Sequence, residues 1–186
     1  MTTSLIQKII DKLRGKPVRF YAIDKKIKVS KTADIDNNTN LGDYTYVGNN
    51  TTITRSIIGR YCSIGNNVTI GPGEHNINEI STSTPLSISS NNYKGLTKDD
   101  CIIGNDVWIG VDSIVRRGVK IGNGVVIGAN SFVNKDVPDF AVVAGNPAKI
   151  IKYRFDETKI KKINESKYWE YPPKEAKKIL KKISNN

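Results

Sequence analysis

The most regular feature of the chain is a recurrence of aliphatic residues at intervals of six positions. In the second half they are Ile103, Ile109, Val115, Ile121, Ile127 and Val133. Glycine follows four of these six residues, and a small or β-branched residue stands four positions after each. Because a helix repeats every 3.6 residues and a strand every two, this interval predicts short strands separated by regular corners.

The same interval organises the first half of the chain. The aliphatic positions there are Ile23, Val29, Ile35, Leu41, Val47 and Ile53, followed after a step of five by Ile58, Ile64 and Ile70. Three strand-and-corner units close one triangular coil of about eighteen residues, and parallel ladders would stack successive coils. We therefore predict an all-β prism over residues 21–148.

The repeat is interrupted after Ile70, at the sequence "GPGEHNINEIS". Continuing the count would place Glu74 and Asn76 inside the prism, where an unpaired carboxylate is costly, so the chain must leave the coil. We expect an excursion loop over residues 74–101. His75, the only histidine, takes an outward position at the exit of this loop, and loops on rigid scaffolds often carry chemistry.

Helical patterns are predicted at both ends. Residues 1–20 contain an apolar stripe that begins after Ser4 and is closed by Gly15 and Pro17. Residues 149–186 contain two amphipathic segments, "RFDETKIKKI" and "PPKEAKKILKKI". We expect these C-terminal helices to cap the open end of the coil and so protect its edge.

Composition narrows the possible partners. The net charge is +11, and residues 149–186 carry twelve Lys or Arg against five Asp or Glu. No nucleic-acid motif accompanies this charge, so we predict solvated lysines and no nucleic-acid partner. No segment has the character of a secretory signal or a bilayer span, and two cysteines without zinc-ligand spacing favour a cytoplasmic protein without a metal.

A cysteine and a pair of arginines are two further candidates for chemistry. Cys62 falls on a small inward position, so we expect a buried thiol and no nucleophile. Arg116 and Arg117 occupy a corner where glycine is usual, and we expect them to be solvated. With one histidine in the chain, a zinc site of three histidines on such a prism is excluded.

Several strings carry a family resemblance: "GRYCSIG", "IGPGEHNINEISTSTP" and "IGNDVWIGVDSIVRRGVKIGNGVVIGANSFVNKDVPDFAVVAGNPAKIIKYRF". They resemble the xenobiotic and saccharide acetyltransferase branch of the hexapeptide-repeat family, nearly to the C-terminus. The resemblance implies a left-handed parallel β-helix, a homotrimer, acetyl-CoA in a groove between adjacent prisms, and a loop histidine acting as base. His75 matches that histidine.

The resemblance also suggests binding roles. Trp108 would pack against the pantetheine arm, and the backbone N–H of Gly110 is our candidate for stabilising an oxyanion. The other expected cofactor contacts are Gly128, Asn134 and Lys135, with Lys149 and Arg154 near the CoA phosphates. The expected acceptor contacts are Glu74, Asn76, Glu79 and Ser81.

Acetyl-CoA is already activated as a thioester, so an acceptor needs only to be positioned and deprotonated, which an imidazole can do. The histidine motif is similar to members that acetylate sugars of surface polysaccharides, although Asn78 stands where those members often carry Asp. We therefore predict O-acetylation of such a sugar or its precursor. The alternatives are N-acetylation of an amino-sugar nucleotide, a xenobiotic acetyltransferase of the streptogramin or chloramphenicol type, and a non-catalytic β-helix scaffold.

Overall fold

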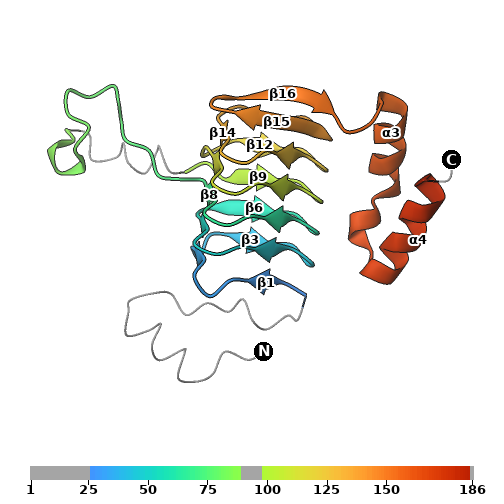
Figure 1. The fold of residues 1–186 in the computed structure, drawn as a ribbon. Helices are drawn as coiled ribbons and strands as arrows, with labels where there is room; N and C mark the ends of the chain where they lie inside the picture. The colour runs from blue at the N-terminus through green and yellow to red at the C-terminus, as the bar shows by residue number, and fades with distance from the viewer. Residues whose placement is uncertain (1–25, 89–97, 185–186) are drawn as a thin grey trace, which may run out of the picture.

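A computed structural model describes residues 26–88 and 98–184 and shows a stack of parallel β-coils with helices along one side (Figure 1). The helix expected within residues 1–20 lies outside the described residues. Three sheets form the faces of the stack, here called A, B and C in the order in which the chain visits them. Each of the first four coils contributes one short strand to each face, as the interval of six predicts, and the last strands of the stack lie on face A.

Face A contains β1 (Lys28–Val29), β4 (Tyr46–Val47), β7 (Ser63–Ile64), β10 (Trp108–Ile109), β13 (Val126–Ile127), β15 (Ala141–Gly145) and β16 (Ala148–Tyr153). Face B contains β2 (Asp34–Ile35), β5 (Thr52–Ile53), β8 (Thr69–Ile70), β11 (Ile114–Val115) and β14 (Phe132–Val133). Face C contains β3 (Asn40–Leu41), β6 (Ser56–Ile58), β9 (Cys101–Ile103) and β12 (Lys120–Ile121). All pairings are parallel except β15 with β16.

The core is a single column of aliphatic side chains along the axis of the prism. Ile53, Ile64, Ile109 and Ile127 are completely buried. The five-residue step at Ile58 keeps the register, because β6 pairs Ile58 with Ile103 of β9. The aliphatic positions predicted to face inward are thus confirmed across the described coils.

Small polar residues also point into the prism, and most of their hydroxyls donate to a backbone carbonyl; the exception is Thr39, whose hydroxyl donates to the Asp36 carboxylate. Thr45 Oγ1 donates to the Gly59 carbonyl at 2.9 Å, and Thr51 Oγ1 donates to the Gly65 carbonyl at 2.7 Å. A buried hydroxyl without a partner would be costly. These pairs explain why Thr and Ser are accepted at the small inward positions.

The corners between faces A and B require a left-handed backbone. Asn50, Asn67, Asp112 and Asn130 have φ values between 54° and 58° at successive corners. Asn and Asp tolerate this conformation better than other side chains. The Asn67 amide also donates to the Asp112 carboxylate at 2.9 Å, so the corners are joined along the stack.

The C-terminal part differs from the prediction in two ways. The helical extension expected from residue 149 begins later, because residues 148–153 form β16, which folds back on β15. The helices α3 (Glu157–Ser166) and α4 (Pro173–Ser184), joined by η2 (Tyr168–Glu170), lie along the side of the prism and do not cap its end (Figure 1). The edge of face A is occupied by β16.

The helices attach to the corner between faces C and A through a second apolar cluster. Phe140, Ile163, Tyr168, Trp169 and Ala176 are buried together there. Asp156 caps the start of helix α3, because its carboxylate accepts from the Lys159 backbone N–H at 2.8 Å. Among the helices in the described ranges, none has the length and apolar character needed to cross a bilayer.

Candidate functional site

The excursion loop leaves the prism after β8 and returns at β9, at the corner between faces B and C. Gly71 is the last residue on the coil ladder: its N–H donates to the Val115 carbonyl at 2.9 Å, and its φ is 67°. From there the loop stands away from the prism (Figure 1). The expected exit of the chain at Glu74 and Asn76 is confirmed.

His75 is exposed on this loop, and its ring is held by one backbone contact. Its Nδ1 lies 2.7 Å from the Thr82 carbonyl oxygen. A carbonyl oxygen can only accept, so Nδ1 carries the proton in this contact and Nε2 carries a lone pair. The imidazole is therefore oriented by a backbone carbonyl and presents a proton acceptor at its far side.

Glu79 organises the loop beyond the histidine. Its carboxylate accepts from Asn76 Nδ2 at 3.3 Å, from Ser87 Oγ at 3.1 Å and from the Ile88 backbone N–H at 3.1 Å. The Asn78 N–H donates to Asn76 Oδ1 at 3.0 Å. Of the expected acceptor contacts, Asn76 and Glu79 are thus occupied in shaping the loop.

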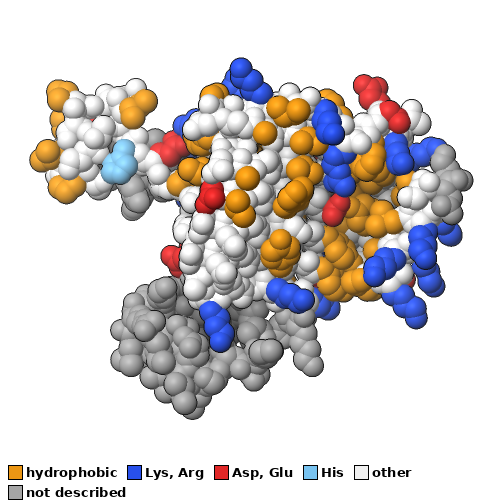
Figure 2. Space-filling model, viewed as in Figure 1, with side chains coloured by type: hydrophobic (Ala, Val, Ile, Leu, Met, Phe, Trp, Pro, Cys, Tyr) orange, Lys and Arg blue, Asp and Glu red, His pale blue; other side chains and the backbone are white. Residues whose placement is uncertain are grey.

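Ser81 plays a smaller part in the same region, because its hydroxyl accepts from the Ser83 backbone N–H at 3.2 Å. Around these polar contacts, Ile77, Ile80, Leu86 and Ile88 are exposed. Figure 2 shows apolar side chains spread around the projecting loop. The loop therefore presents an apolar surface as well as an imidazole.

Arg116 and Arg117 hold the base of the loop. Arg116 stays exposed, as expected of a solvated side chain, and Arg117 is only partly exposed, but both make contacts that the sequence did not predict. Arg116 forms a two-pronged pair with Glu74, with Nε–Oε1 and Nη2–Oε2 distances of 2.5 and 2.9 Å. This hydrogen bond is the main reason why the pKa of Glu74 is lowered. Glu74 is therefore committed to an ion pair next to His75.

A polar pocket of about 400 Å³ opens beside this pair. Glu74, Arg116 and Arg117 line it together with Asn134 and Lys135 from the corner after β14. The structure thus brings together Glu74, Asn134 and Lys135, which were expected to bind acceptor or cofactor. Asp99 and Asp136 also line the pocket, so three carboxylates balance its three cations. This mixture of hydrogen-bond donors and acceptors suits a polyhydroxylated molecule.

Trp108 and the two glycines lie elsewhere, on face A and its corner with face B. Trp108 points outward and is 55% exposed, between Ser63 and Val126 on the neighbouring strands. Its exposed ring offers an apolar surface against which a ligand can pack. In one chain, the face with Trp108 and the corner with His75 are separate parts of the triangular coil.

The Gly110 N–H is not free for an oxyanion, because it donates to the Ile127 carbonyl at 2.8 Å within the ladder. A Cβ on Gly110 would lie 2.6 Å from the Ala129 nitrogen, so glycine is needed there for stacking. Glycine is less strictly needed at position 128, because an added Cβ would lie 3.0 Å from the methyl carbon of Ala144. Both glycines have structural reasons to be present.

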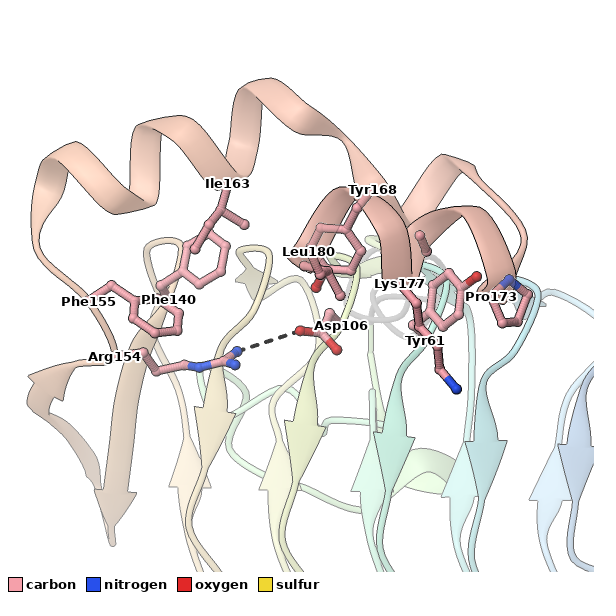
Figure 3. Close-up of a pocket in the computed structure, with 11 residues that line it drawn as sticks. Tyr61, Asp106, Phe140, Arg154, Phe155, Ile163, Tyr168, Pro173, Lys177 and Leu180 are labelled. Atoms are coloured by element: carbon pink, nitrogen blue, oxygen red, sulfur yellow. Dashed lines mark ion pairs between the residues drawn. The ribbon is translucent and has the colours of Figure 1, made fainter. Parts of the chain in front are cut away.

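Lys149 and Arg154 differ in availability. Lys149 is exposed on β16. Arg154 instead pairs with Asp106 at 3.6 Å, donates to the Gly124 carbonyl at 2.6 Å, and lies over the Phe140 and Phe155 rings (Figure 3). Arg154 therefore joins the helices to the prism, and only Lys149 of this pair is free to meet a phosphate.

The cavity around Arg154 belongs to this packing. It measures about 330 Å³ and is lined by the corner residues Tyr61 and Asp106 and by Tyr168 of η2 (Figure 3). Burial, and then the hydrogen bond with Asp106, raise the pKa of Tyr168. Sequence reasoning missed this cluster, although the aromatic "KYWEYP" segment is the signal that could have indicated it.

The cysteines carry no accessible chemistry. Cys62 is buried as predicted, and burial raises the pKa of its thiol to about 12. Cys101 is also a free, buried thiol whose pKa is raised by burial. Within residues 26–88 and 98–184, no group of three or more His, Cys, Asp or Glu is arranged to hold a metal ion.

The fold and the loop define a class of proteins in which a parallel β-helix presents a histidine on a projecting loop. The family described as "Bacterial transferase hexapeptide (six repeats)" matches residues 38–72 and 100–135, on either side of the loop. A probable macrolide acetyltransferase of Lysinibacillus sphaericus is 34% identical over 142 residues, covering 71% of this chain and 76% of the relative. The chain belongs to the hexapeptide-repeat acetyltransferase family, and its fold is the left-handed parallel β-helix that was predicted.

Two more relatives add detail. A chloramphenicol acetyltransferase of Agrobacterium fabrum strain C58 is 40% identical over 137 residues, or 68% of this chain. The chain spans a little under two thirds of that relative's length, 65%. A solved galactoside acetyltransferase in complex with coenzyme A superposes with a TM-score of 0.56 at 28% identity, covering 72% of this chain and 66% of the other.

Proposed function

We propose that the protein is an acetyl-CoA-dependent O-acetyltransferase that acts on a sugar hydroxyl, with His75 as the general base. The observation that carries this proposal is the contact of His75 Nδ1 with the Thr82 carbonyl, which leaves a lone pair on an exposed Nε2. Acetyl-CoA supplies an acetyl group already activated as a thioester. The family membership and the coenzyme A complex of a structural relative support this co-substrate.

His75 can perform both proton transfers of such a reaction. Nε2 takes the proton of the acceptor hydroxyl as its oxygen attacks the acetyl carbonyl carbon. The imidazolium then returns that proton to the departing thiolate, which restores the starting state. The Thr82 carbonyl accepts from Nδ1–H in both the neutral and the protonated ring, so it holds the orientation of the imidazole through the reaction. A carboxylate plays this part in other sites, and Asn78 carries no such charge.

The chain's own residues fit coenzyme A at Trp108 and Lys149. The exposed Trp108 ring, flanked by the small residues Ser63 and Val126, suits an apolar arm. Lys149 and Lys152 are exposed on β16 of the same face and suit phosphate groups. We further propose that Asn134 and Lys135, in the polar pocket, contact the cofactor or the acceptor.

A homotrimer is part of the proposal. His75 and Trp108 lie on different parts of one prism, so a site that uses both needs a second copy of the chain. Outward aliphatic residues are available for such an interface: Ile57, Ile102 and Ile114 are each at least 40% exposed, as are the loop residues Ile77, Ile80, Leu86 and Ile88. Light scattering on the purified protein tests this; a monomer at working concentrations would contradict the shared site.

A second acceptor class has its own support. The relatives of Agrobacterium and Lysinibacillus are named for chloramphenicol and macrolides, which carry hydroxyl groups as sugars do. O-acetylation of a hydroxylated antibiotic is therefore the second candidate. Both candidates use His75 in the same way. The two free cysteines fit a reducing compartment, so we place the enzyme in the cytoplasm.

Thiol release from acetyl-CoA, measured against sugars, amino-sugar nucleotides, chloramphenicol and macrolides, separates these acceptors. Mass spectrometry then shows whether the product is an ester. We expect His75→Ala to lower turnover by about 10²- to 10⁴-fold. Calorimetric binding of coenzyme A and the thermal midpoint should be unchanged, as in the control Lys161→Ala on α3. A His75→Ala variant with near wild-type turnover would refute the base assignment.

A further inference from the structure

Three arginines meet the two ends of the loop at one corner of the prism. Strand β8, from which the loop departs, lies between β5 and β11 on face B. Arg55 follows β5, and Arg116 and Arg117 follow β11, so both neighbouring coils bring cationic side chains to the place where the loop begins. The six-residue register itself therefore stacks these arginines around the exit.

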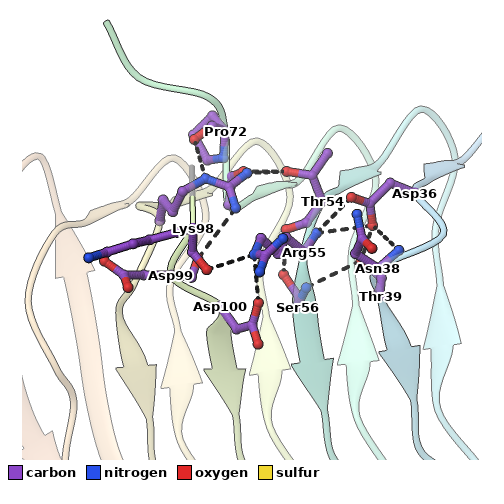
Figure 4. Close-up of polar contacts among 12 residues, drawn as sticks. Asp36, Asn38, Thr39, Thr54, Arg55, Ser56, Pro72, Lys98, Asp99 and Asp100 are labelled. Carbon is purple, nitrogen blue, oxygen red and sulfur yellow. Dashed lines mark hydrogen bonds and ion pairs between the residues drawn. The ribbon is translucent and has the colours of Figure 1, made fainter. Parts of the chain in front are cut away.

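Arg117 joins the outgoing and returning ends of the loop. Its guanidinium donates to the carbonyls of Gly71 and Pro72 on the outgoing side, with 3.3 Å for Pro72. It also donates to the Asp99 carbonyl on the returning side at 3.4 Å and to Thr54 Oγ1 at 2.7 Å (Figure 4). One side chain thus ties both ends to the coil below.

Arg55 secures the returning end from the other side. Its Nε lies 2.7 Å from the Lys98 carbonyl and 3.0 Å from the Asp100 carboxylate (Figure 4). Arg116 secures the outgoing end through its two-pronged pair with Glu74, the residue that precedes His75. A two-pronged arginine and carboxylate pair sets direction as well as distance.

We propose that Arg116, acting through Glu74, and Arg117 are positioning residues for His75. They set the direction in which the loop leaves the rigid coil, and the imidazole follows one residue after the last fixed side chain. Beyond Glu74, the contacts of Glu79 fix the internal conformation of the loop. The two arginines therefore determine the position of the loop relative to the prism. This inference rests on the proposed function of His75 as the base.

The kinetic test uses Glu74→Gln, Arg116→Met and Arg117→Met. We expect kcat to fall by about 10- to 100-fold, because a small displacement of a catalytic group is costly, while the KM for acetyl-CoA changes by less than about twofold. The exchanged pair Glu74→Arg with Arg116→Glu should recover at least part of the lost kcat. Unchanged kcat in all three single variants would overturn the proposal.

A second measurement needs no substrate. Because the chain has one histidine, a long-range ¹H–¹⁵N spectrum contains one imidazole, and its pattern reports which ring nitrogen carries the proton. We expect a single sharp Nδ1-protonated form in the wild type. In Arg116→Met and Arg117→Met the signal should shift or broaden, with the Nδ1-protonated share reduced. An unshifted signal in both variants would overturn the proposal.

The matched control is Asp43→Asn. It breaks the Asp43 pair with Arg60, whose Nη2–Oδ2 distance is 3.2 Å, at a corner remote from the loop. We expect neither the His75 signal nor kcat to change. Thermal melting of every variant identifies any that fail to fold. If the spectrum responds to the arginine variants but no acceptor is acetylated, the proposed function fails and the positioning stands.

Discussion

In the prism, each coil contributes aliphatic side chains to one buried column, whereas in the described part of the loop, residues 72–88 and 98–100, aliphatic side chains are exposed and the chain is held by hydrogen bonds and ion pairs. Ile64 illustrates the first region, since it is fully buried between β4 and β10. Ile80 illustrates the second, since it is fully exposed on the loop. The comparison shows that folding energy and candidate chemistry occupy different parts of the chain.

The largest stability effect is expected from the column of the prism. Ile64→Ala should lower the free energy of unfolding by about 2–5 kcal/mol, because it removes buried methyl groups and leaves a cavity. Ile80→Ala, the matched change on the loop, should alter it by less than about 0.5 kcal/mol. Urea denaturation of both variants measures this; equal losses would break the distinction between prism and loop.

The next largest loss of stability is expected at the corner glycines. Gly110→Ala should cost about 1–3 kcal/mol, because its methyl group would lie 2.6 Å from the Ala129 nitrogen, a backbone atom that cannot move alone. Gly128→Ala should cost less, since it meets only a methyl group at 3.0 Å. Thermal and urea unfolding compare the two. The reverse order would show that corner stacking is not what selects glycine.

Arg154 and Lys149 are expected to differ in role: Arg154 stabilises the fold, whereas Lys149 binds the cofactor. Arg154→Met should lower the free energy of unfolding by about 1–3 kcal/mol, because it leaves the half-buried Asp106 carboxylate and the buried Gly124 carbonyl without their cationic partner. The KM for acetyl-CoA should stay unchanged. Lys149→Met should do the opposite, raising that KM with no loss of stability. A raised KM in Arg154→Met would restore this residue to the cofactor site.

The smallest effect is a pH response confined to the loop. Arg116 holds the pKa of Glu74 below its ordinary value, so the pair stabilises the loop above that ordinary value and loses its contribution as pH falls through the lowered pKa. Hydrogen exchange of residues 72–88, corrected for its intrinsic pH dependence, should therefore accelerate below about pH 4.5 relative to the prism. Glu74→Gln should remove this extra response; if it persists, another group is responsible.

The extent of sequence prediction follows the same division. The interval of six identified Ile109 and Cys62 as inward and placed His75 at the exit of a loop, because period and polarity are local properties. It could not anticipate that Arg117 would reach Asp99, or that Arg154 would reach Asp106. Each of these contacts joins a corner of the prism to a segment that lies outside the six-residue repeat: the loop in the first case and the segment before α3 in the second. The need for a fixed oxyanion donor on a rigid corner made Gly110 a candidate, and only the ladder hydrogen bond showed that its N–H is in use.

By itself, the sequence determined the triangular coil, its register and the point of departure of the loop, because burying Glu74 and Asn76 in an apolar prism is too costly. Tertiary structure alone decided the state of the site. The carbonyl of Thr82 orients His75, and Arg116 and Arg117 contact the two ends of the loop. The helices pack along the side of the prism. These outcomes depend on directional contacts between side chains brought together by stacking, which no spacing along the chain specifies.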